Sequence, residues 1–353
     1  MHLARNRIPL NTACTTENIF PPIHGRMAHM RAWRVHEYGH YDTVLRLEDV
    51  EPPRATAESS VVRVRAAGLN FADILSIAGK YQVKAPLPFT PGMESVGEVI
   101  EPGPGSKYSV GDRLISMSPS GAFGEYLLLA DDFSFPVPAT IPDADAAALL
   151  MTYQTAYFGL VRRGELRAGE TLLVHGGAGG VGTAAIQLGK ALGATVIATA
   201  GGAEKLDVCR RCGAEHVIDY KTEDFVARVK QITDGRGADV ILDNVGGDVF
   251  DQSLRCIAWE GRVVVCGFAG GRIPQIPANK IMLKNIAVTG IFWGQYQVHN
   301  PKLVTEAQET LYRLYAEGKI RPVIYRTFPL DELPAALRAM EGRQSYGKIV
   351  LSV

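Results

Sequence analysis

The chain has 353 residues, with 37 basic and 37 acidic side chains and a formal net charge of zero. This length is enough for two domains with a large core. The charge balance argues against a general nucleic-acid-binding protein and against a polybasic membrane anchor. No run approaches the ~18 apolar residues of a membrane span. Five cysteines in such a chain favour a reducing compartment, the cytoplasm, over a disulfide framework.

The N-terminal residues 1–29 differ in composition from the remainder of the chain. Residues 1–26 contain prolines and scattered arginines without apolar periodicity, and they lack the apolar core of a secretory signal. A scarcity of acidic residues is typical of organellar transit peptides, but the prolines interrupt any amphipathic helix and no serine is present. We therefore expect either a disordered extension or a segment that reflects an upstream start codon, with the fold beginning at Met30.

Two patterns of secondary structure succeed each other along the chain. From Met30 to about Pro138, partly alternating segments such as Val61–Arg65 and glycine–proline turns predict a mostly antiparallel β domain. From Asp143 to about Gly290, strands alternate with helices, which predicts a doubly wound parallel sheet. The expected strands of this sheet are at 171–175, 195–199, 216–219, 239–242, 262–266 and 286–290.

The C-terminal part adds two helices, at 300–318 and 331–340, and a final strand at 347–353. We expect this tail to return to the first domain. The predicted fold is therefore α/β with two domains. The β domain covers 30–151 and is completed by 295–353, and the domain with the parallel sheet covers 152–294.

A glycine-rich turn comes directly after the first strand of the parallel sheet. Gly177, Gly179 and Gly182 form the pattern G-x-G-x-x-G, with Gly180 and Val181 inside it. An apolar strand precedes the pattern, and apolar residues at helical spacing come after it. A glycine pattern between a strand and a helix indicates a dinucleotide site. The first glycine permits a tight turn, the second a close approach of the pyrophosphate, and the third close packing of helix and strand. The N–H groups at the helix start hold the anion.

The end of the second strand indicates which dinucleotide is bound. An NAD site usually has an acidic residue there for the ribose 2′-hydroxyl. Here Thr199 is followed by small neutral residues, no acid occurs before Glu204, and Lys205 comes next. A neutral strand end beside a cation suits a 2′-phosphate, so we expect NADPH. The alternative is that Lys205 is an ordinary solvated lysine.

Two other features carry ordinary structural explanations. Cys209 and Cys212 form C-x-x-C inside a helical stretch without a second pair, which argues against zinc or redox chemistry. His175 ends the first strand of the parallel sheet, where we expect a hydrogen-bonded structural histidine rather than an acid–base catalyst.

Several motifs in order make the chain resemble one family. They are AGLNFAD at 67–73, TPGME at 90–94, VGDRL at 110–114, DNVGG at 243–247, GFA at 267–269 and YGKIV at 346–350. From Met30 to Val353 the chain resembles the medium-chain dehydrogenase/reductase superfamily, in its zinc-independent NADPH:quinone oxidoreductase branch, which includes ζ-crystallin. The resemblance implies a GroES-like catalytic domain, a Rossmann domain, an active site in the cleft between them and a homodimer joined through the Rossmann domains.

The metal ligands of zinc-dependent relatives are replaced. The matching positions are Asn70, Met93 and Met151, and asparagine and thioether are poor zinc ligands. The four-cysteine structural lobe is also missing. Glu94 and Asp73 remain, but two carboxylates do not specify a zinc site. We expect no metal and a reaction that needs no Lewis acid.

The resemblance implies hydride transfer from NADPH to a quinone. Asn70 and Tyr81 are the expected hydrogen-bond donors to the oxygen on which negative charge builds. Asn70 could instead cap the helix that begins at Phe71, and Tyr81 could be an aromatic wall of the cleft. Some quinone reductases have a tyrosine where this chain has Leu75, which weakens the transfer of their substrate preference.

The resemblance also implies further contacts to NADPH. Lys205 and Tyr220 should flank the 2′-phosphate, and each aromatic residue could instead be core packing. The remaining expected contacts are Thr155, Thr199, Asn244, Val245, Phe268, Ala269, Phe292, Trp293, Gly294 and Lys348.

Two other functions stay open. The same hydride could reduce α,β-unsaturated ketones, aldehydes or acyl thioesters. A protein of this fold could also bind the nucleotide without catalysis, because fold does not settle function.

Overall fold

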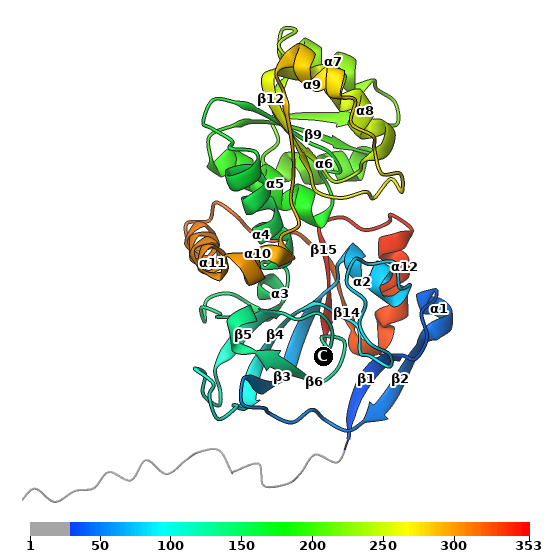
Figure 1. Ribbon diagram of the computed structural model, residues 1–353, viewed down its shortest axis with the longest axis vertical. Coiled ribbons are helices and arrows are strands. Elements are labelled where there is room, and N and C mark those ends of the chain that lie inside the picture. Colours follow the sequence, from blue (N-terminus) through cyan, green and yellow to red (C-terminus); the bar gives the residue numbers. More distant parts are fainter. Residues whose placement is uncertain (1–28) are drawn as a thin grey trace, which may run out of the picture.

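Figure 1 shows the computed structural model of the chain, which describes residues 29–353. The expected extension over 1–29 lies almost entirely outside the described residues, as does Cys14. A β-rich domain occupies the lower part of the view and a domain with a parallel sheet occupies the upper part. The predicted two-domain α/β fold is confirmed.

The β-rich domain is built on a seven-stranded sheet in the order β14-β15-β3-β4-β5-β7, with β6 paired to β3. Its strands are β3 (Ser59–Gly68), β4 (Glu94–Glu101), β5 (Arg113–Met117), β6 (Tyr126–Ala130), β7 (Ser134–Pro136), β14 (Ile324–Pro329) and β15 (Lys348–Ser352). A separate ribbon pairs β1 (Met30–Val35) with β2 (Leu45–Val50). Because β15 lies antiparallel to β3, the C-terminal tail returns to this domain, as predicted.

Six parallel strands form the second sheet, in the order β10-β9-β8-β11-β12-β13. They are β8 (Thr171–Val174), β9 (Thr195–Ala200), β10 (His216–Asp219), β11 (Ala238–Asp243), β12 (Ile257–Val265) and β13 (Ala287–Gly290). All six predicted strands are present. β12 begins at Ile257, earlier than expected, because Ala238 pairs with Ile257 ahead of a shift in register.

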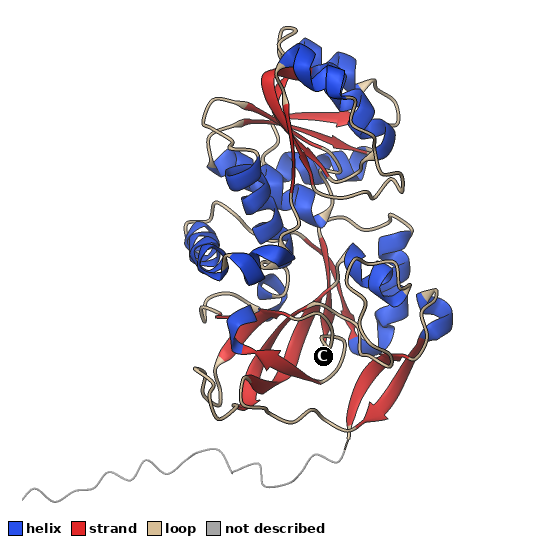
Figure 2. Ribbon diagram, in the orientation of Figure 1, coloured by secondary structure: helices blue, strands red, loops and turns tan. Residues whose placement is uncertain are grey.

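Helices cover both faces of the parallel sheet (Figure 2). They are α5 (Gly180–Ala191), α6 (Ala203–Cys212), α7 (Phe225–Ile232), α8 (Gly247–Cys256) and α9 (Ala278–Lys284). The central strand β8 is therefore covered on both sides, and Leu172, Leu173 and Val174 are fully buried. This explains its continuous apolar run. Each such side chain contributes about 1.5–3 kcal/mol through burial.

The remaining elements join the domains or cover the β-rich domain. They are α1 (Tyr41–Val44), α2 (Phe71–Ile77), η1 (Asp131–Phe133), α3 (Asp143–Ala146), α4 (Met151–Tyr157), the π-helical η2 (Phe158–Arg163), α10 (Gly294–His299), α11 (Pro301–Ala316), η3 (Leu330–Glu332) and α12 (Leu333–Glu341). The two predicted C-terminal helices correspond to α11 and to η3 with α12. Within residues 29–353, no helix has the length and hydropathy that a membrane crossing requires.

Candidate active site

The glycine-rich turn connects β8 to α5 and leaves no room for a side chain at Gly177 or Gly182. A Cβ on Gly182 would lie 2.2 Å from the carbonyl oxygen of Gly176, and a Cβ on Gly177 would lie 2.9 Å from the Ala198 Cβ. The left-handed residue of the turn is Gly176, with φ +61°. The expectation that Gly177 makes the tight turn is therefore corrected: Gly176 turns the chain, and Gly177 allows close packing against β9.

The N-terminus of α5 presents unpaired backbone donors at this turn. Gly179 is the N-cap, and Gly180 and Val181 are the first helical residues, whose N–H groups have no partner within the helix. Gly179 is exposed, so this end of α5 is accessible. Such a helix start attracts an anion through its N–H groups and its dipole.

Three cations lie together beyond the end of β9. The Lys205 ammonium donates to the carbonyl oxygen of Arg343 at 2.7 Å. Burial lowers the pKa of Lys205, and the positive charges of Lys221 and Arg343 lower it further. Of these cations the sequence predicted Lys205 alone. Lys221 and Arg343 were missed, and only Lys221 lies near enough in sequence to have been proposed.

Tyr220 belongs to the same group. A Cβ on Gly201 would lie 2.7 Å from the Tyr220 hydroxyl oxygen and 2.9 Å from the Lys221 Cε, so glycine is needed for these side chains to fold over the strand end. Tyr220 is half-exposed. The neutral end of β9 is thus bordered by three positive charges and a phenol, which together suit a phosphate.

His175 has both ring nitrogens engaged. They lie 3.0 Å from Thr199 Oγ1 and 2.8 Å from Ser253 Oγ, and the ring is packed edge-on against Phe225. Burial lowers the pKa of His175 to about 4. The predicted structural histidine is confirmed. Thr199, expected at the cofactor, is buried and supports the glycine-rich turn, because its carbonyl oxygen accepts from the Gly177 N–H at 2.8 Å.

The carboxyl ends of β11 and β12 bring Asn244 and Ala269 together. The Ala269 N–H donates to the Asn244 carbonyl oxygen at 3.2 Å. The Asn244 amide donates to the His175 carbonyl oxygen at 3.1 Å, while its Oδ1 is buried without a partner among the described residues. Buried acceptors are normally bonded, so this unpaired oxygen makes Asn244 a candidate for contact with a ligand donor. Val245 and Phe268 are the adjacent residues of these two loops.

The residues after β13 that were predicted to contact the cofactor have different surroundings in the structure. Trp293 is buried, and its indole N–H donates to Gln154 Oε1 at 3.2 Å, so it holds α4 in place. Phe292 is exposed, and its ring lies edge-on to Tyr81 with centroids 6.5 Å apart. Gly294 begins α10, and Thr155 lies half-buried on α4.

The Tyr81 hydroxyl makes no hydrogen bond to any residue in 29–353. Burial raises the pKa of Tyr81, and the nearby Asp73 charge raises it further. The phenol is therefore protonated at neutral pH and available as a donor.

A buried ion pair lies beneath the start of α2. Lys348 Nζ lies 2.6 Å from Glu94 Oε2 and 2.5 Å from Asn70 Oδ1. The Asn70 Nδ2 donates to the Gly68 carbonyl oxygen and to Glu94 Oε2, both at 3.2 Å. Asn70 is the N-cap residue of α2, as the alternative interpretation held, but in this arrangement both hydrogens of its amide are taken. Neither is left for an acceptor oxygen.

Asp73 completes this cluster. Its Oδ2 accepts from the Asn70 backbone N–H at 2.7 Å, while its Oδ1 is buried without a partner among the described residues. Burial raises the pKa of Asp73 to about 7, against the smaller opposing effects of the Asn70 N–H and the Lys348 charge. A carboxyl group of this kind titrates near neutral pH.

Within residues 29–353, no group of three or more His, Cys, Asp or Glu side chains is placed to hold a metal ion. The ammonium of Lys348 contacts both Asn70 and Glu94, and this fixed positive charge opposes a divalent cation there. The thiols of Cys209 and Cys212 are buried, and burial raises their pKa values to about 12 and about 11. Thiols that stay protonated are poor nucleophiles and metal ligands.

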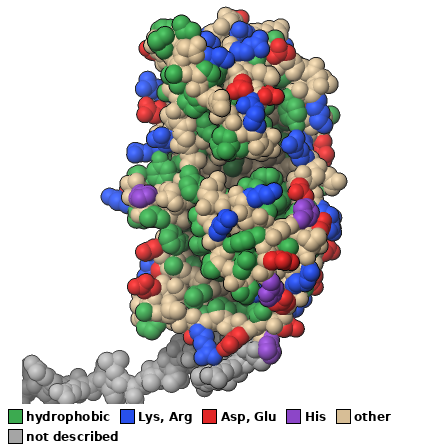
Figure 3. Space-filling model, turned by 45° about the vertical axis from the view of Figure 1, so that its right-hand side comes forward, with side chains coloured by type: hydrophobic (Ala, Val, Ile, Leu, Met, Phe, Trp, Pro, Cys, Tyr) green, Lys and Arg blue, Asp and Glu red, His purple; other side chains and the backbone are tan. Residues whose placement is uncertain are grey.

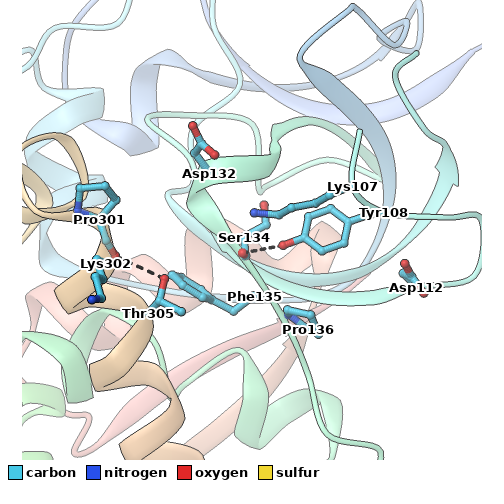
Figure 4. Close-up of a pocket in the computed structure, with 10 residues that line it drawn as sticks. All are labelled: Lys107, Tyr108, Asp112, Asp132, Ser134, Phe135, Pro136, Pro301, Lys302 and Thr305. Atoms are coloured by element: carbon cyan, nitrogen blue, oxygen red, sulfur yellow. Dashed lines mark hydrogen bonds between the residues drawn. The ribbon is translucent and has the colours of Figure 1, made fainter. Parts of the chain in front are cut away.

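Figure 3 shows the surface hollowed between the two domains, with hydrophobic side chains exposed around the hollow. A different hollow, of about 580 Å³, lies where the β-rich domain meets α11 (Figure 4). It combines Lys107 and Lys302 with Asp112 and Asp132, so it has no net preference for charge. None of the residues predicted for the site lines it.

Comparisons with known proteins agree with this geometry. The family model "Alcohol dehydrogenase GroES-like domain" matches residues 56–139, and "Zinc-binding dehydrogenase" matches residues 180–309. The chain is 41% identical over 295 residues to "Quinone oxidoreductase-like protein 2 homolog" of Nematostella vectensis, covering 82% of this chain and 80% of the relative.

Two further proteins are similar over most of their length. The crystal structure of Escherichia coli quinone oxidoreductase complexed with NADPH has a TM-score of 0.86 and 31% identity, covering 92% of this chain and 100% of that one. The rat "Synaptic vesicle membrane protein VAT-1 homolog" is 35% identical over 333 residues, covering 89% of this chain and 82% of the relative.

Proposed function

The chain belongs to the quinone oxidoreductase branch of the medium-chain dehydrogenase/reductase superfamily, and on that premise we propose that it transfers a hydride from NADPH to quinones without zinc. The observation that carries the proposal is the cation cluster at the neutral end of β9. Lys205, Lys221 and Arg343 lie there beyond the glycine-rich turn, where a 2′-phosphate would extend from a bound pyrophosphate.

The residues present fit NADPH. The turn at 176–182 has no room for side chains at Gly177 and Gly182, and the N–H groups at the start of α5 are available to a pyrophosphate. The unpartnered Oδ1 of Asn244 lies in the loop after β11, at the carboxyl edge of the sheet where such folds bind nucleotides. Thr155, Phe268 and Phe292 are the proposed contacts on the nicotinamide side. When bound, NADPH supplies the hydride and carries the electron chemistry.

The protein's own part in the reaction is to place the acceptor and to receive its developing charge. We assign the donor to the Tyr81 hydroxyl, which has no hydrogen-bond partner among residues 29–353 and whose pKa is raised above its ordinary value by burial, so it is protonated at neutral pH. A donor aimed at the acceptor oxygen favours the transition state as negative charge builds there. Asn70 supports this arrangement by holding Lys348 and Glu94, since its own amide is engaged.

The proposed independence from zinc rests on the chemistry of three side chains. Asn70, Met93 and Met151 stand where zinc-dependent relatives have ligands, and Lys348 places a positive charge beside the first of them. Oxidation of a simple alcohol would need a Lewis acid or a strong base. Reduction of an electron-poor carbonyl needs neither.

An acceptor screen tests the proposal. Purified protein is mixed with NADPH and, in turn, a small quinone, an enone and an enoyl thioester, and the loss of NADPH absorbance is monitored. We expect the highest kcat/KM with the quinone. Turnover restricted to the enone or the thioester would assign the protein to conjugated carbonyl reduction. Binding of NADPH without turnover of any acceptor would indicate a non-enzymatic role.

We also propose a homodimer. Strand β13 is at the edge of the parallel sheet, and α9 before it exposes Met282 and Leu283 to solvent. Open edges and exposed apolar side chains favour association with another chain. Light scattering after gel filtration should give twice the mass of 38.2 kDa, and Leu283→Glu should reduce it.

A further inference from the structure

The residue before Lys348 touches the glycine-rich turn directly. The Gly347 N–H donates to the Ala178 carbonyl oxygen at 2.7 Å, and Gly347 pairs with Gly179 in an isolated parallel bridge. This contact joins the two domains at the point where a pyrophosphate would bind. A displacement of the glycine-rich turn when a nucleotide binds would therefore displace Gly347 directly.

The backbone at this contact has little freedom. Gly347 has φ +53°, and a Cβ there would lie 2.1 Å from the Val323 carbonyl oxygen. The Lys348 N–H donates to the same oxygen at 2.8 Å. A displacement of Gly347 is thus passed to Lys348 rather than absorbed between them.

The side chain of Lys348 ends in the buried polar cluster on the acceptor side. Its ammonium is bound to Asn70 and Glu94, and Glu94 Oε1 accepts from the backbone N–H groups of Leu150 and Met151 at 3.1 and 2.8 Å. The cluster therefore anchors the starts of both α2 and α4. The Lys348 ammonium donates to both Asn70 Oδ1 and Glu94 Oε2, and methionine at this position would have no donor for either oxygen.

The anchored helix α2 determines where Tyr81 lies. The N–H groups of Lys80 and Tyr81 both donate to the Leu75 carbonyl oxygen, at 2.8 and 3.1 Å. Tyr81, the proposed donor to the acceptor oxygen, is thus hydrogen-bonded to the last turn of a helix whose N-cap residue, Asn70, is held by Lys348.

We infer that Lys348 is a positioning residue that couples occupation of the glycine-rich turn to the placement of α2 and Tyr81. The inference rests on the proposed function in taking a nicotinamide dinucleotide as the ligand of the turn. Lys348 need not touch the nucleotide or the acceptor for this role. It transmits the state of one site to the other through Gly347 and the Asn70–Glu94 cluster, as energetic coupling between sites requires.

Hydrogen exchange tests the coupling without turnover. The full chain is compared with and without saturating NADP⁺, and exchange is read separately over 176–183 and 71–81. In the native protein, NADP⁺ should slow exchange at both segments, by at least about fivefold in 71–81, the lower end of ordinary coupling. In Lys348→Met the slowing at 176–183 should persist while that at 71–81 is lost.

Two further variants keep the result interpretable. Lys284→Met is the matched control, because Lys284 also donates to backbone carbonyls, those of Leu254 and Ile257, but on the far side of the parallel sheet. It should behave as the native protein. The double variant Lys348→Met/Glu94→Gln also removes the carboxylate that would otherwise be left without a counter-ion. It replaces the single variant if that variant does not fold. In it, NADP⁺ should likewise fail to slow exchange at 71–81.

The outcomes separate the inference from the proposed function. No slowing at 176–183 in the native protein would overturn nucleotide binding, and with it both proposals. Slowing at 176–183 but not at 71–81 in the native protein, or equal slowing at 71–81 in the Lys348 variants, would overturn the coupling alone. With a quinone acceptor, the coupling predicts that Lys348→Met lowers kcat about tenfold or more while the NADPH dissociation constant changes less than about threefold.

Discussion

Lys348 Nζ lies 2.6 Å from Glu94 Oε2, and both groups are almost wholly removed from solvent, with exposures of 4% and 0%. They belong to β15 and β4, strands far apart in the sequence that are joined through β3 in one sheet. A buried pair of this kind gives little net stability relative to apolar residues, but the loss of one partner leaves a charge uncompensated.

Removal of Lys348 alone should therefore be costly. We expect Lys348→Met to lower the free energy of unfolding by about 3–5 kcal/mol, because Glu94 loses its counter-ion in a site that water does not reach. Lys348→Met/Glu94→Gln should recover most of that loss. Urea unfolding monitored by circular dichroism gives both values. A single variant as stable as the native protein would show that the pair is not buried in solution.

Asp73 and His175 should have opposite effects on stability across acidic pH. The pKa of Asp73 is raised from 3.8 to about 7, so between these values the folded protein keeps a proton that the unfolded chain releases, and the free energy of unfolding falls as pH rises. The pKa of His175 is lowered from 6.5 to about 4, so between these values the free energy of unfolding rises with pH.

In the native protein, the pH dependences of the free energy of unfolding that Asp73 and His175 cause oppose each other. In Asp73→Asn, the rise of this free energy with pH that His175 causes should therefore become visible. The Asp73 contribution is worth up to about 4 kcal/mol, so the variant should gain stability relative to the native protein from pH 4 to pH 7 and keep that gain above it. Thermal unfolding across this range measures the difference. A difference that does not depend on pH would contradict the raised pKa.

The cation cluster predicts selectivity for NADPH over NADH. A charged hydrogen bond to phosphate is worth about 1.5–3 kcal/mol, so Lys205→Ala should weaken NADPH binding roughly tenfold or more and leave NADH binding nearly unchanged. Arg343→Ala should act in the same direction, since the positive charge of Arg343 lies near that of Lys205 and lowers the Lys205 pKa. Arg338→Ala is a matched control because Arg338 is on α12 and pairs with Asp42. Equal native affinities for the two nucleotides would refute the assignment.

Tyr81→Phe and Asn70→Ala should both lower turnover, but only the second should also lower the stability of the fold. Loss of one oxyanion donor commonly costs about 10²–10³ in rate, and a quinone's own electron affinity should reduce this to about tenfold for Tyr81→Phe. Asn70→Ala should lower kcat with little change in NADPH affinity, and it should also destabilise the fold because it removes a partner of Lys348. Steady-state kinetics with a quinone, beside melting curves, distinguish the two. A native rate in Tyr81→Phe would remove Tyr81 from the reaction.

The parts of the fold that could be predicted are those encoded by local periodicity. β8 reads as an apolar run because it is the buried central strand, and the glycine pattern after it is sterically required at Gly177 and Gly182. The positive φ of Gly176 was not predicted, because a spacing of glycines does not say which of them carries the left-handed backbone.

The rest of the site depends on tertiary contacts. Arg343 is 138 residues from Lys205 along the chain, and Lys348 is 254 residues from Glu94. No local pattern reports such neighbours. For the same reason the sequence suggested Asn70 as a donor to the acceptor, whereas its amide is saturated by Gly68, Glu94 and Lys348 in the folded protein.

The rate of NADPH consumption with a small quinone, measured on purified protein before and after exhaustive treatment with a zinc chelator, tests the central claim most directly. The account predicts steady consumption of one NADPH per quinone reduced, at the same rate in both samples. The reason is that the Tyr81 hydroxyl, positioned by Lys348, Asn70 and Glu94, stabilises the acceptor oxygen without a metal. No consumption with the quinone, or a rate that disappears on chelation and returns with zinc, would contradict it.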